Sequence, residues 1–349
     1  MSTPLHSLIA TGTKLWLDSV DPDLVSSFQK LGATGATSNP AIISGLLSGD
    51  RFDAELSALM RTESDNEALA WAMTDRLVSQ AESQFTDVWN ATKGNDGYVS
   101  FEVDPMIDAS ESTLSNAERT ARYISEAKRW SDAHPNRMIK VPATPAGLAA
   151  VEEIVASGIP INITLLFTSK QYQQARDAVW AGYQRCDNKD LVKSVYSIFV
   201  SRIDVYTAKH VPQLAGASQG LVGLVNAKRI WQENRDFWSG KETALEQEIV
   251  FASTGTKDPK LPAWSYVEAL AGGDIQTNPP ATNQAIQESS VAFTKQLDQL
   301  PAAEIITDID SKVDFDKLEE VLMREGLAKF AAPHQKLLQS ISEKRAALV

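Results

Sequence analysis

The chain of 349 residues is poor in the two residue types that most often build cross-links and metal centres. It has one cysteine, Cys186, which excludes an intrachain disulfide and fits a reducing compartment. Its four histidines, His6, His134, His210 and His334, are too dispersed along the chain to suggest a metal site. We therefore expect neither a metal nor a disulfide framework.

Long hydrophobic runs are also missing. No apolar run approaches the roughly 20 residues that a membrane-spanning helix needs. The first residues, MSTPLHSLIATGTK, have neither the basic nor the apolar region of a signal peptide. These two absences predict a soluble, cytoplasmic protein with no membrane partner, and they are compatible with either a monomer or a homodimer.

Positive charge is in short supply, since 33 Lys and Arg face 45 Asp and Glu and the formal net charge is −12. This balance argues against a nucleic-acid partner, which would need a basic face, but a local cluster of cations could still bind an anionic substrate. The sequence has no HExxH, GxGxxG or CxxC motif, and its one GxSxG match, GASQG (216–220), does not directly follow a β-rich run as a nucleophile elbow would. A hydrolase triad, a zinc enzyme and a dinucleotide-dependent dehydrogenase therefore have no support.

What the sequence does contain is a regular alternation of short β-rich runs with helical stretches. Several runs are apolar throughout, as expected for parallel strands that are covered on both faces. Eight such runs, each followed by a helical stretch, predict a (β/α)₈ TIM barrel. The runs are KLWLDSV (14–20), GATSN (35–39), YVSFEVD (98–104), MIKVPA (138–143), INITLLF (161–167), SVYSIFV (194–200), IVFASTG (249–255) and GDIQTNP (273–279).

Helix signals agree with this pattern. One helix should begin behind Thr144-Pro145 and end at Gly158, and another should begin behind Thr168. Residues 51–92 are too long for one crossover, so we expect inserted helices after the second strand. Residues 315–349 predict a C-terminal helical extension. We interpret residues 1–349 as one elaborated barrel domain.

Polar residues recur near the carboxyl ends of the predicted strands. In a barrel these ends converge on one mouth, where the active site is found. The set is therefore more informative than any member of it. Its members are Asp18, Asn39, Glu102, Lys140, Asn162, Thr164, Ser197, Arg202, Ser253 and Lys257.

Several of these residues also have an ordinary structural explanation. Asp18 could initiate a turn, and Asn39, followed by a proline, could cap a helix. Arg202 and Asp204 could form a surface ion pair of little energetic value. Lys140 is harder to explain in this way, although read alone it could point at water from an edge strand or form an ion pair. It shares a face of an apolar strand with Met138, and in a closed barrel this face would be the interior. A buried, uncharged amine can attack a carbonyl and form a Schiff base.

Six motifs in this order resemble the transaldolase family. They are TSNP (37–40), YVSFEVDP (98–105), MIKVPATPAG (138–147), GIPINITLLF (158–167), FVSRID (199–204) and FASTGTKDP (251–259). The resemblance runs from about residue 14 to residue 290, and the C-terminal REGLAKFAAPHQKLL is similar to the longer bacterial branch. It implies a (β/α)₈ barrel without a metal or an organic cofactor. The implied reaction moves a dihydroxyacetone unit from sedoheptulose 7-phosphate or fructose 6-phosphate to an aldose phosphate, in the pentose phosphate pathway.

The resemblance also implies roles for individual residues. Lys140 matches the Schiff-base lysine, and Asp18 matches the aspartate that takes the proton of the donor's C4 hydroxyl. Glu102 and Thr164 match the pair that holds a catalytic water. The remaining matches are substrate-binding residues, with Asn39, Asn162 and Ser197 for the three-carbon unit and Arg202, Ser253 and Lys257 for the phosphate.

Two departures from the family pattern concern substrate detail. Met106 stands where relatives often have arginine, and Phe251 stands where tryptophan is common. The alternatives are a fructose 6-phosphate aldolase-type lyase and a transaldolase for another anionic sugar. Phe199 and Glu102 favour a transaldolase over the lyase.

Overall fold

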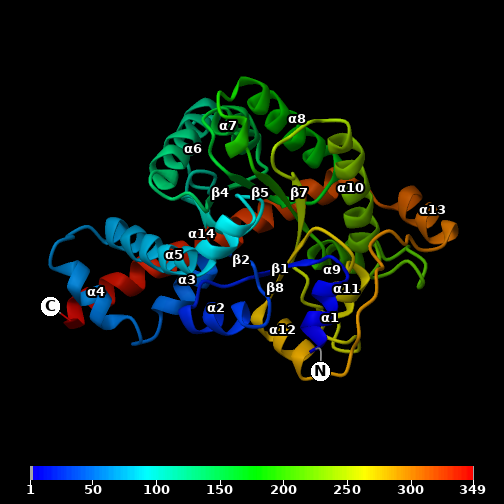
Figure 1. Ribbon diagram of the computed structural model, residues 1–349, viewed down its shortest axis with the longest axis horizontal. Helices are drawn as coiled ribbons and strands as arrows, with labels where there is room; N and C mark the ends of the chain where they lie inside the picture. Colours follow the sequence, from blue (N-terminus) through cyan, green and yellow to red (C-terminus); the bar gives the residue numbers. More distant parts are fainter. Residues whose placement is uncertain (1–2, 349) are drawn as a thin grey trace.

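The computed structural model describes residues 3–348 and contains a closed barrel of eight parallel strands (Figure 1). The strands pair in sequence order, and β8 closes the barrel by pairing with β1. This confirms the predicted (β/α)₈ fold, and each of the eight runs holds one strand. The bounds are β1 Lys14–Leu17, β2 Gly35–Thr37, β3 Val99–Glu102, β4 Arg137–Pro142, β5 Ile161–Leu166, β6 Ser194–Phe199, β7 Glu248–Ala252 and β8 Ile275–Asn278.

Helices surround the barrel and carry the chain from one strand to the next. The predicted insertion after β2 contains α4 and α5, and α5 leads directly into β3. The bounds are α1 Pro4–Ala10, α2 Pro22–Gln29, α3 Pro40–Leu47, α4 Asp53–Met60, α5 Asn66–Ala91, α6 Asn116–Ser131, α7 Pro145–Ala156, α8 Ser169–Arg185, η1 Lys189–Leu191, α9 Ser201–His210, α10 Val222–Ser239, α11 Ser265–Ala269, α12 Pro280–Gln287, α13 Ala303–Lys312 and α14 Phe315–Leu348.

The starts of these helices follow from local sequence. Thr144 caps α7 by accepting a hydrogen bond from the backbone N–H of Gly147, and Thr168 caps α8 in the same way. Ser115 and Glu118 form a capping box at α6. Because Thr144 and Thr168 stand directly after β4 and β5, the ends of these two strands are held against the starts of rigid helices.

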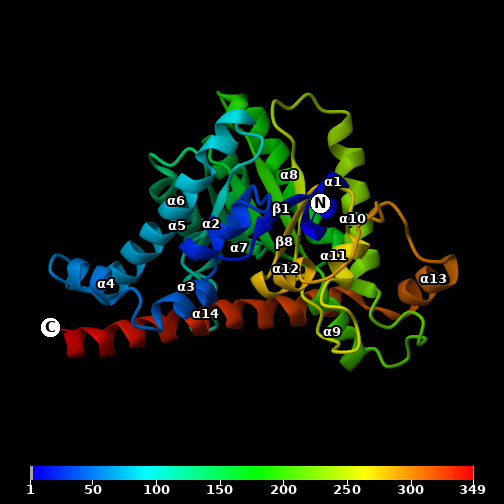
Figure 2. The ribbon, with the colours of Figure 1, turned by 60° about the horizontal axis from the view of Figure 1, so that its bottom comes forward.

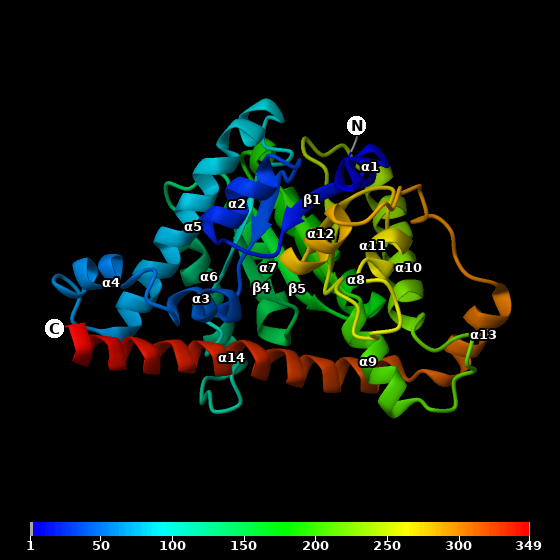
Figure 3. The same ribbon diagram turned by 90° about the horizontal axis from the view of Figure 1, so that it is seen from below.

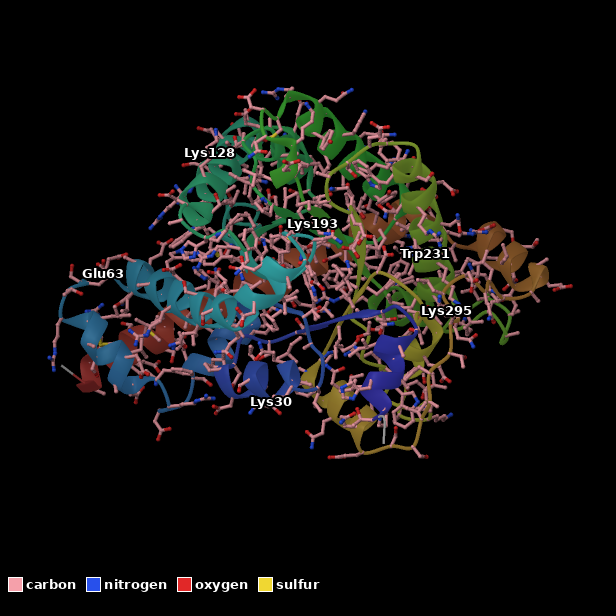
Figure 4. The ribbon with its side chains drawn as sticks, viewed as in Figure 1. Lys30, Glu63, Lys128, Lys193, Trp231 and Lys295 are labelled. Carbon is pink, nitrogen blue, oxygen red and sulfur yellow. The ribbon has the colours of Figure 1, made fainter. Side chains whose placement is uncertain are left out.

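The lower half of the barrel interior is filled by an apolar layer. This layer consists of Trp16, Tyr98, Met138, Val195, Val250 and Ile275. Gly35 makes room for the Trp16 indole, since a Cβ on Gly35 would lie 2.6 Å from Trp16 Nε1 and 2.6 Å from the Tyr98 carbonyl oxygen. Lys193, which is labelled in Figure 4, directly precedes β6. Its buried ammonium donates to Glu248 Oε2 at 2.5 Å. The interior is therefore closed below the strand ends.

The C-terminal extension is a single long helix, α14, that runs along one side of the molecule (Figures 2 and 3). It contacts α3, α4 and α5 towards its C-terminal end and α9 towards its start. Leu318, Leu322 and Phe330 of α14 share a hydrophobic cluster with Leu165 and Phe167 from the end of β5. The helix thus lies across the carboxyl ends of the strands.

None of the helices between residues 3 and 348 combines the length and the apolar character that crossing a bilayer requires.

Candidate active site

A cavity of about 160 Å³ opens at the carboxyl ends of the strands. Its wall includes eight of the ten residues that the sequence selected, and only Glu102 and Asn162 are not part of it. The cavity thus brings together residues from β4, β5 and β6 and from the segments that follow β1, β2, β6 and β7. The selected residues on the wall are Asp18, Asn39, Lys140, Thr164, Ser197, Arg202, Ser253 and Lys257.

Lys140 stands on β4 between two inward-facing polar neighbours. The strand register pairs it with Glu102 of β3 on one side and with Asn162 of β5 on the other. Its side chain is buried, and its Nζ lies 3.1 Å from Glu102 Oε2 and 3.2 Å from the Ser38 carbonyl oxygen. Met138, two residues earlier, belongs to the apolar layer below. Lys140 consequently projects into the barrel, and a solvent-facing edge strand is excluded.

Glu102 lies behind Lys140, close to the cavity wall. Burial raises the pKa of Glu102, and the neighbouring Lys140 ammonium offsets part of this rise. The hydroxyl oxygen of Thr164 is buried and makes no hydrogen bond to any residue between 3 and 348. Beside the lysine there is thus a carboxyl group that can exchange a proton closer to neutral pH, together with an unused hydroxyl.

Asp18 ends β1 and is held by a chain of hydroxyl groups. Thr37 Oγ1 donates to Asp18 Oδ1 at 3.0 Å and lies 3.0 Å from Thr277 Oγ1. Because Thr37 has a single hydroxyl proton, Thr277 must be the donor in the second bond. Burial raises the pKa of Asp18, whereas the Lys140 charge, the Thr37 hydroxyl and the Arg202 charge lower it.

Two amides border the site in different ways. Asn39 caps α3 by accepting from the Ile42 N–H at 3.0 Å, as the structural explanation predicted, and it also lines the cavity. Its oxygen serves the cap, so its amide nitrogen is the group that could reach a ligand. Asn162 is fully buried, and its amide is engaged by Ser100 and Ser197 at 2.9 and 2.7 Å.

The other end of the cavity carries positive charge. The Arg202 guanidinium stacks on the Phe199 ring at 4.7 Å, and its buried Nη1 has no hydrogen-bond partner in the described part of the chain. Burial lowers the pKa of Arg202, although Glu102 and Asp18 counter this effect. The surface ion pair considered for Arg202 and Asp204 does not form, because Asp204 is buried and accepts hydrogen bonds from the Gly223 N–H and from the Tyr266 hydroxyl.

Ser253 and Lys257 come from the loop after β7. Ser253 has a left-handed backbone conformation with φ of 57°, and its hydroxyl lies 2.9 Å from Ser201 Oγ. Both residues line the same cavity as Arg202. A guanidinium with an unused N–H, an ammonium and a hydroxyl are the groups that proteins use to hold phosphate oxygens.

The seven wall residues that were not selected from the sequence include Thr37, Thr277 and Phe330. Thr37 and Thr277 stand at strand ends, so the rule that selected their neighbours could have found them. Phe330 comes from α14, and its ring centroid lies 5.7 Å from Lys140 Nζ. An apolar residue on a helical extension has no sequence signal that distinguishes it from an ordinary core residue.

Comparison with known proteins assigns the family. Residues 15–341 match the model of the Transaldolase/Fructose-6-phosphate aldolase family. The chain is 33% identical to the Transaldolase of Thermobifida fusca, over 99% of this chain and 100% of that protein. It is 32% identical to Transaldolase 2 of Streptomyces avermitilis, over 97% and 96%, and 31% identical to the Transaldolase of Trichodesmium erythraeum, over 95% of each. On these matches, and with a barrel that carries a buried lysine at its mouth, the chain belongs to the transaldolase/fructose-6-phosphate aldolase family.

Proposed function

We propose that this enzyme is a class I transaldolase, which forms a Schiff base at Lys140 and passes a dihydroxyacetone unit from a ketose phosphate to an aldose phosphate. One observation carries the proposal. The Lys140 amine is buried at the cavity wall, 3.1 Å from Glu102, in a site that also contains the Asp18 carboxyl group. An amine with carboxyl groups beside it is what carbonyl capture and proton transfer require.

The first half of the reaction is capture of the donor. The Lys140 amine adds to the C2 carbonyl of the ketose to give a carbinolamine, which loses water and becomes an iminium ion. Glu102 and Thr164 hold the water that carries protons during these steps. The raised pKa of Glu102 and the unused Thr164 hydroxyl support this assignment.

The second half breaks and remakes a carbon–carbon bond. Asp18 takes the proton of the C4 hydroxyl, the C3–C4 bond breaks, and the aldose phosphate leaves. The bonding electrons move into the iminium and give an enamine on Lys140, so the nitrogen acts as the electron sink. The enamine then attacks the acceptor aldehyde, whose oxygen takes the proton back from Asp18, and water releases the new ketose by the reverse of the capture steps.

The remaining polar groups would hold the two ends of the substrate. Asn39, Asn162 and Ser197 are assigned to the dihydroxyacetone hydroxyls. Asn162 is engaged by Ser100 and Ser197, which supports a role in fixing the site more than a long reach into the cavity. Arg202, Ser253 and Lys257 are assigned to the phosphate.

Borohydride trapping with fructose 6-phosphate tests the mechanism. We expect a reduced three-carbon adduct on Lys140 in the wild-type enzyme, located by mass spectrometry, and no adduct in Lys140→Ala. The matched control is Lys257→Ala, which removes the other lysine of the cavity wall and should keep the adduct. An adduct on Lys257, or an active enzyme without any adduct, would refute the role of Lys140.

The second candidate is a lyase that releases free dihydroxyacetone, since the matched family includes fructose 6-phosphate aldolases. Cleavage of fructose 6-phosphate is measured with and without erythrose 4-phosphate. A transferase depends strongly on the acceptor, whereas a lyase proceeds without it. A transaldolase for another anionic sugar would show the same dependence but a different donor preference.

The setting of the enzyme is also part of the proposal. We place it in the cytoplasm, on the basis of its single cysteine, which fits a reducing compartment. Sugar phosphates are its proposed ligands, with neither nucleic acid nor membrane as a partner, and it would act as a monomer or a homodimer.

A further inference from the structure

The aromatic ring of Phe330 forms the part of the cavity wall that covers Lys140. Phe330 is buried, lines the cavity and places its ring centroid 5.7 Å from Lys140 Nζ. Phe199 also lines the cavity, but its ring stacks on Arg202 at 4.7 Å and packs on Phe167. The two rings therefore serve different ends of the site.

The position of the Phe330 ring is fixed because α14 is anchored on both sides of it. Near the start of the helix, Thr168 donates to Glu319 at 2.6 Å. Near the other end, Lys344 pairs with Asp53, and Arg345 donates to Asn66 at 2.8 Å. The helix spans the mouth between these anchors, with Phe330 in its middle.

Close packing also sets the distance between α14 and the strand ends of the barrel. A Cβ on Gly326 would lie 3.0 Å from Leu165 Cδ2, so α14 packs closely on the end of β5 at this point. Leu165 reaches up to this point because β5 is irregular between Ile163 and Leu166, and Leu165 has φ of 57°. Phe330 lies one turn after Gly326, so its ring is held close to Lys140.

From this geometry we infer that Phe330 decides whether the three-carbon intermediate is transferred or hydrolysed. The inference rests on the proposed function. In hydrolysis, C3 of the enamine takes a proton, water adds to C2 of the resulting iminium, and the bond from C2 to the lysine nitrogen breaks. Free dihydroxyacetone and the Lys140 amine are the products. Transfer joins C3 to the acceptor aldehyde instead.

A phenyl ring suits this task because it cannot hydrogen-bond to a water molecule. It has no hydrogen-bonding group that could hold a further water molecule beside the enamine, in addition to the one that Glu102 and Thr164 hold for capture and release, and its face attracts the iminium cation without bringing in a nucleophile. Most other groups on the wall are polar, so they favour a bound water more than they exclude it. Removing the ring should therefore admit water beside the lysine.

The test is the ratio of free dihydroxyacetone to transferred product, at fixed fructose 6-phosphate and saturating erythrose 4-phosphate. We expect Phe330→Ala to raise this ratio about tenfold, and Phe330→Leu, which keeps most of the apolar volume, to raise it about threefold. The matched control is Leu322→Ala, because Leu322 is buried in the same cluster of α14 but does not line the cavity. It should lower the melting temperature and change the ratio by less than about twofold.

An unchanged ratio in both Phe330 variants would overturn the inference. An equal rise in Leu322→Ala would also overturn it, since loosening of the helix would then explain the effect. Borohydride trapping separates these outcomes from a failure of the proposed function. A wild-type enzyme without an adduct on Lys140 refutes the Schiff-base mechanism and this inference together, whereas an adduct with an unchanged ratio refutes the inference alone.

Discussion

The hydroxyl chain from Thr277 through Thr37 to Asp18 should set the pH at which the enzyme becomes active. Thr37→Val removes the hydroxyl that donates to Asp18 Oδ1 at 3.0 Å and keeps nearly the same volume. A hydrogen bond to a charged group contributes about 1.5–3 kcal/mol, and one pKa unit corresponds to about 1.4 kcal/mol. Full loss of the bond would raise the pKa of Asp18 by roughly 1–2 units. Asp18 is partly exposed to the cavity, where water can replace the donor, so we expect about one unit.

The direction of the shift follows from the proposed role of Asp18 as a base. Only the carboxylate form can take the C4 proton, and the Thr37 bond favours this form. Without it the carboxylate forms at higher pH, so the acid limb of the kcat/KM profile should move upward by about one pH unit. Activity near neutral pH falls less than activity on the acid side.

Cleavage of fructose 6-phosphate in the presence of erythrose 4-phosphate, followed across the pH range, measures this limb. Thr277→Val is the matched control, because it removes the second hydroxyl and leaves the bond from Thr37 to Asp18 intact. Its limb should move by less than about half a unit. An acid limb that stays in place in Thr37→Val, or that moves to lower pH, would show that Asp18 does not govern it.

Three further predictions concern the barrel and the phosphate end. Gly35→Ala should lower the free energy of unfolding in urea by about 3 kcal/mol, because its Cβ would collide with the Trp16 indole and a backbone oxygen. Arg202→Lys should raise KM for fructose 6-phosphate at least about tenfold with a smaller change in kcat, since the bidentate fork is lost. Burial and the neighbouring Glu248 raise the pKa of Asp274 to about 7. As pH rises, the native state therefore keeps this proton to a higher pH than the unfolded chain does. The contribution of Asp274 to the free energy of unfolding consequently falls by about 4 kcal/mol between about pH 4 and about pH 7. Asp274→Asn should remove this pH dependence, which urea unfolding measures.

Each of these expectations has a contrary result. Wild-type stability in Gly35→Ala would mean that the Trp16 indole can move aside at little cost. An unchanged KM in Arg202→Lys would remove Arg202 from the phosphate site, and unphosphorylated fructose serves as the control that should not respond. Equal pH dependence in the wild type and in Asp274→Asn would contradict the raised pKa of Asp274.

Sequence reasoning succeeded where a residue's chemistry conflicts with its surroundings. Lys140 interrupts an apolar strand, and its alternation with Met138 already placed it inside the barrel. Because the strand ends of a parallel barrel converge, Asp18 and Arg202 could be assigned to the same site without knowledge of their contacts. Asn39 combines the two explanations given for it, since it caps a helix and also lines the cavity.

Features that depend on long-range packing were not predictable in this way. The register of β8 decides that Thr277 faces inward beside Thr37, and that strand has the weakest pattern of the eight. The irregularity at Leu165 has no local signal such as a glycine. Phe330 acquires its place only because α14 is held across the mouth at both ends, which is a property of the tertiary structure alone.

The order of segments along the chain has a consequence for how the enzyme is made. Phe330 belongs to α14, which follows all eight strands, whereas Lys140 stands in the fourth. As the chain is synthesised, the strand that carries the reactive amine emerges long before the wall that covers it. The amine is therefore uncovered until α14 docks, so that a nascent or C-terminally clipped chain would carry the proposed nucleophile without the wall that covers it in the complete barrel.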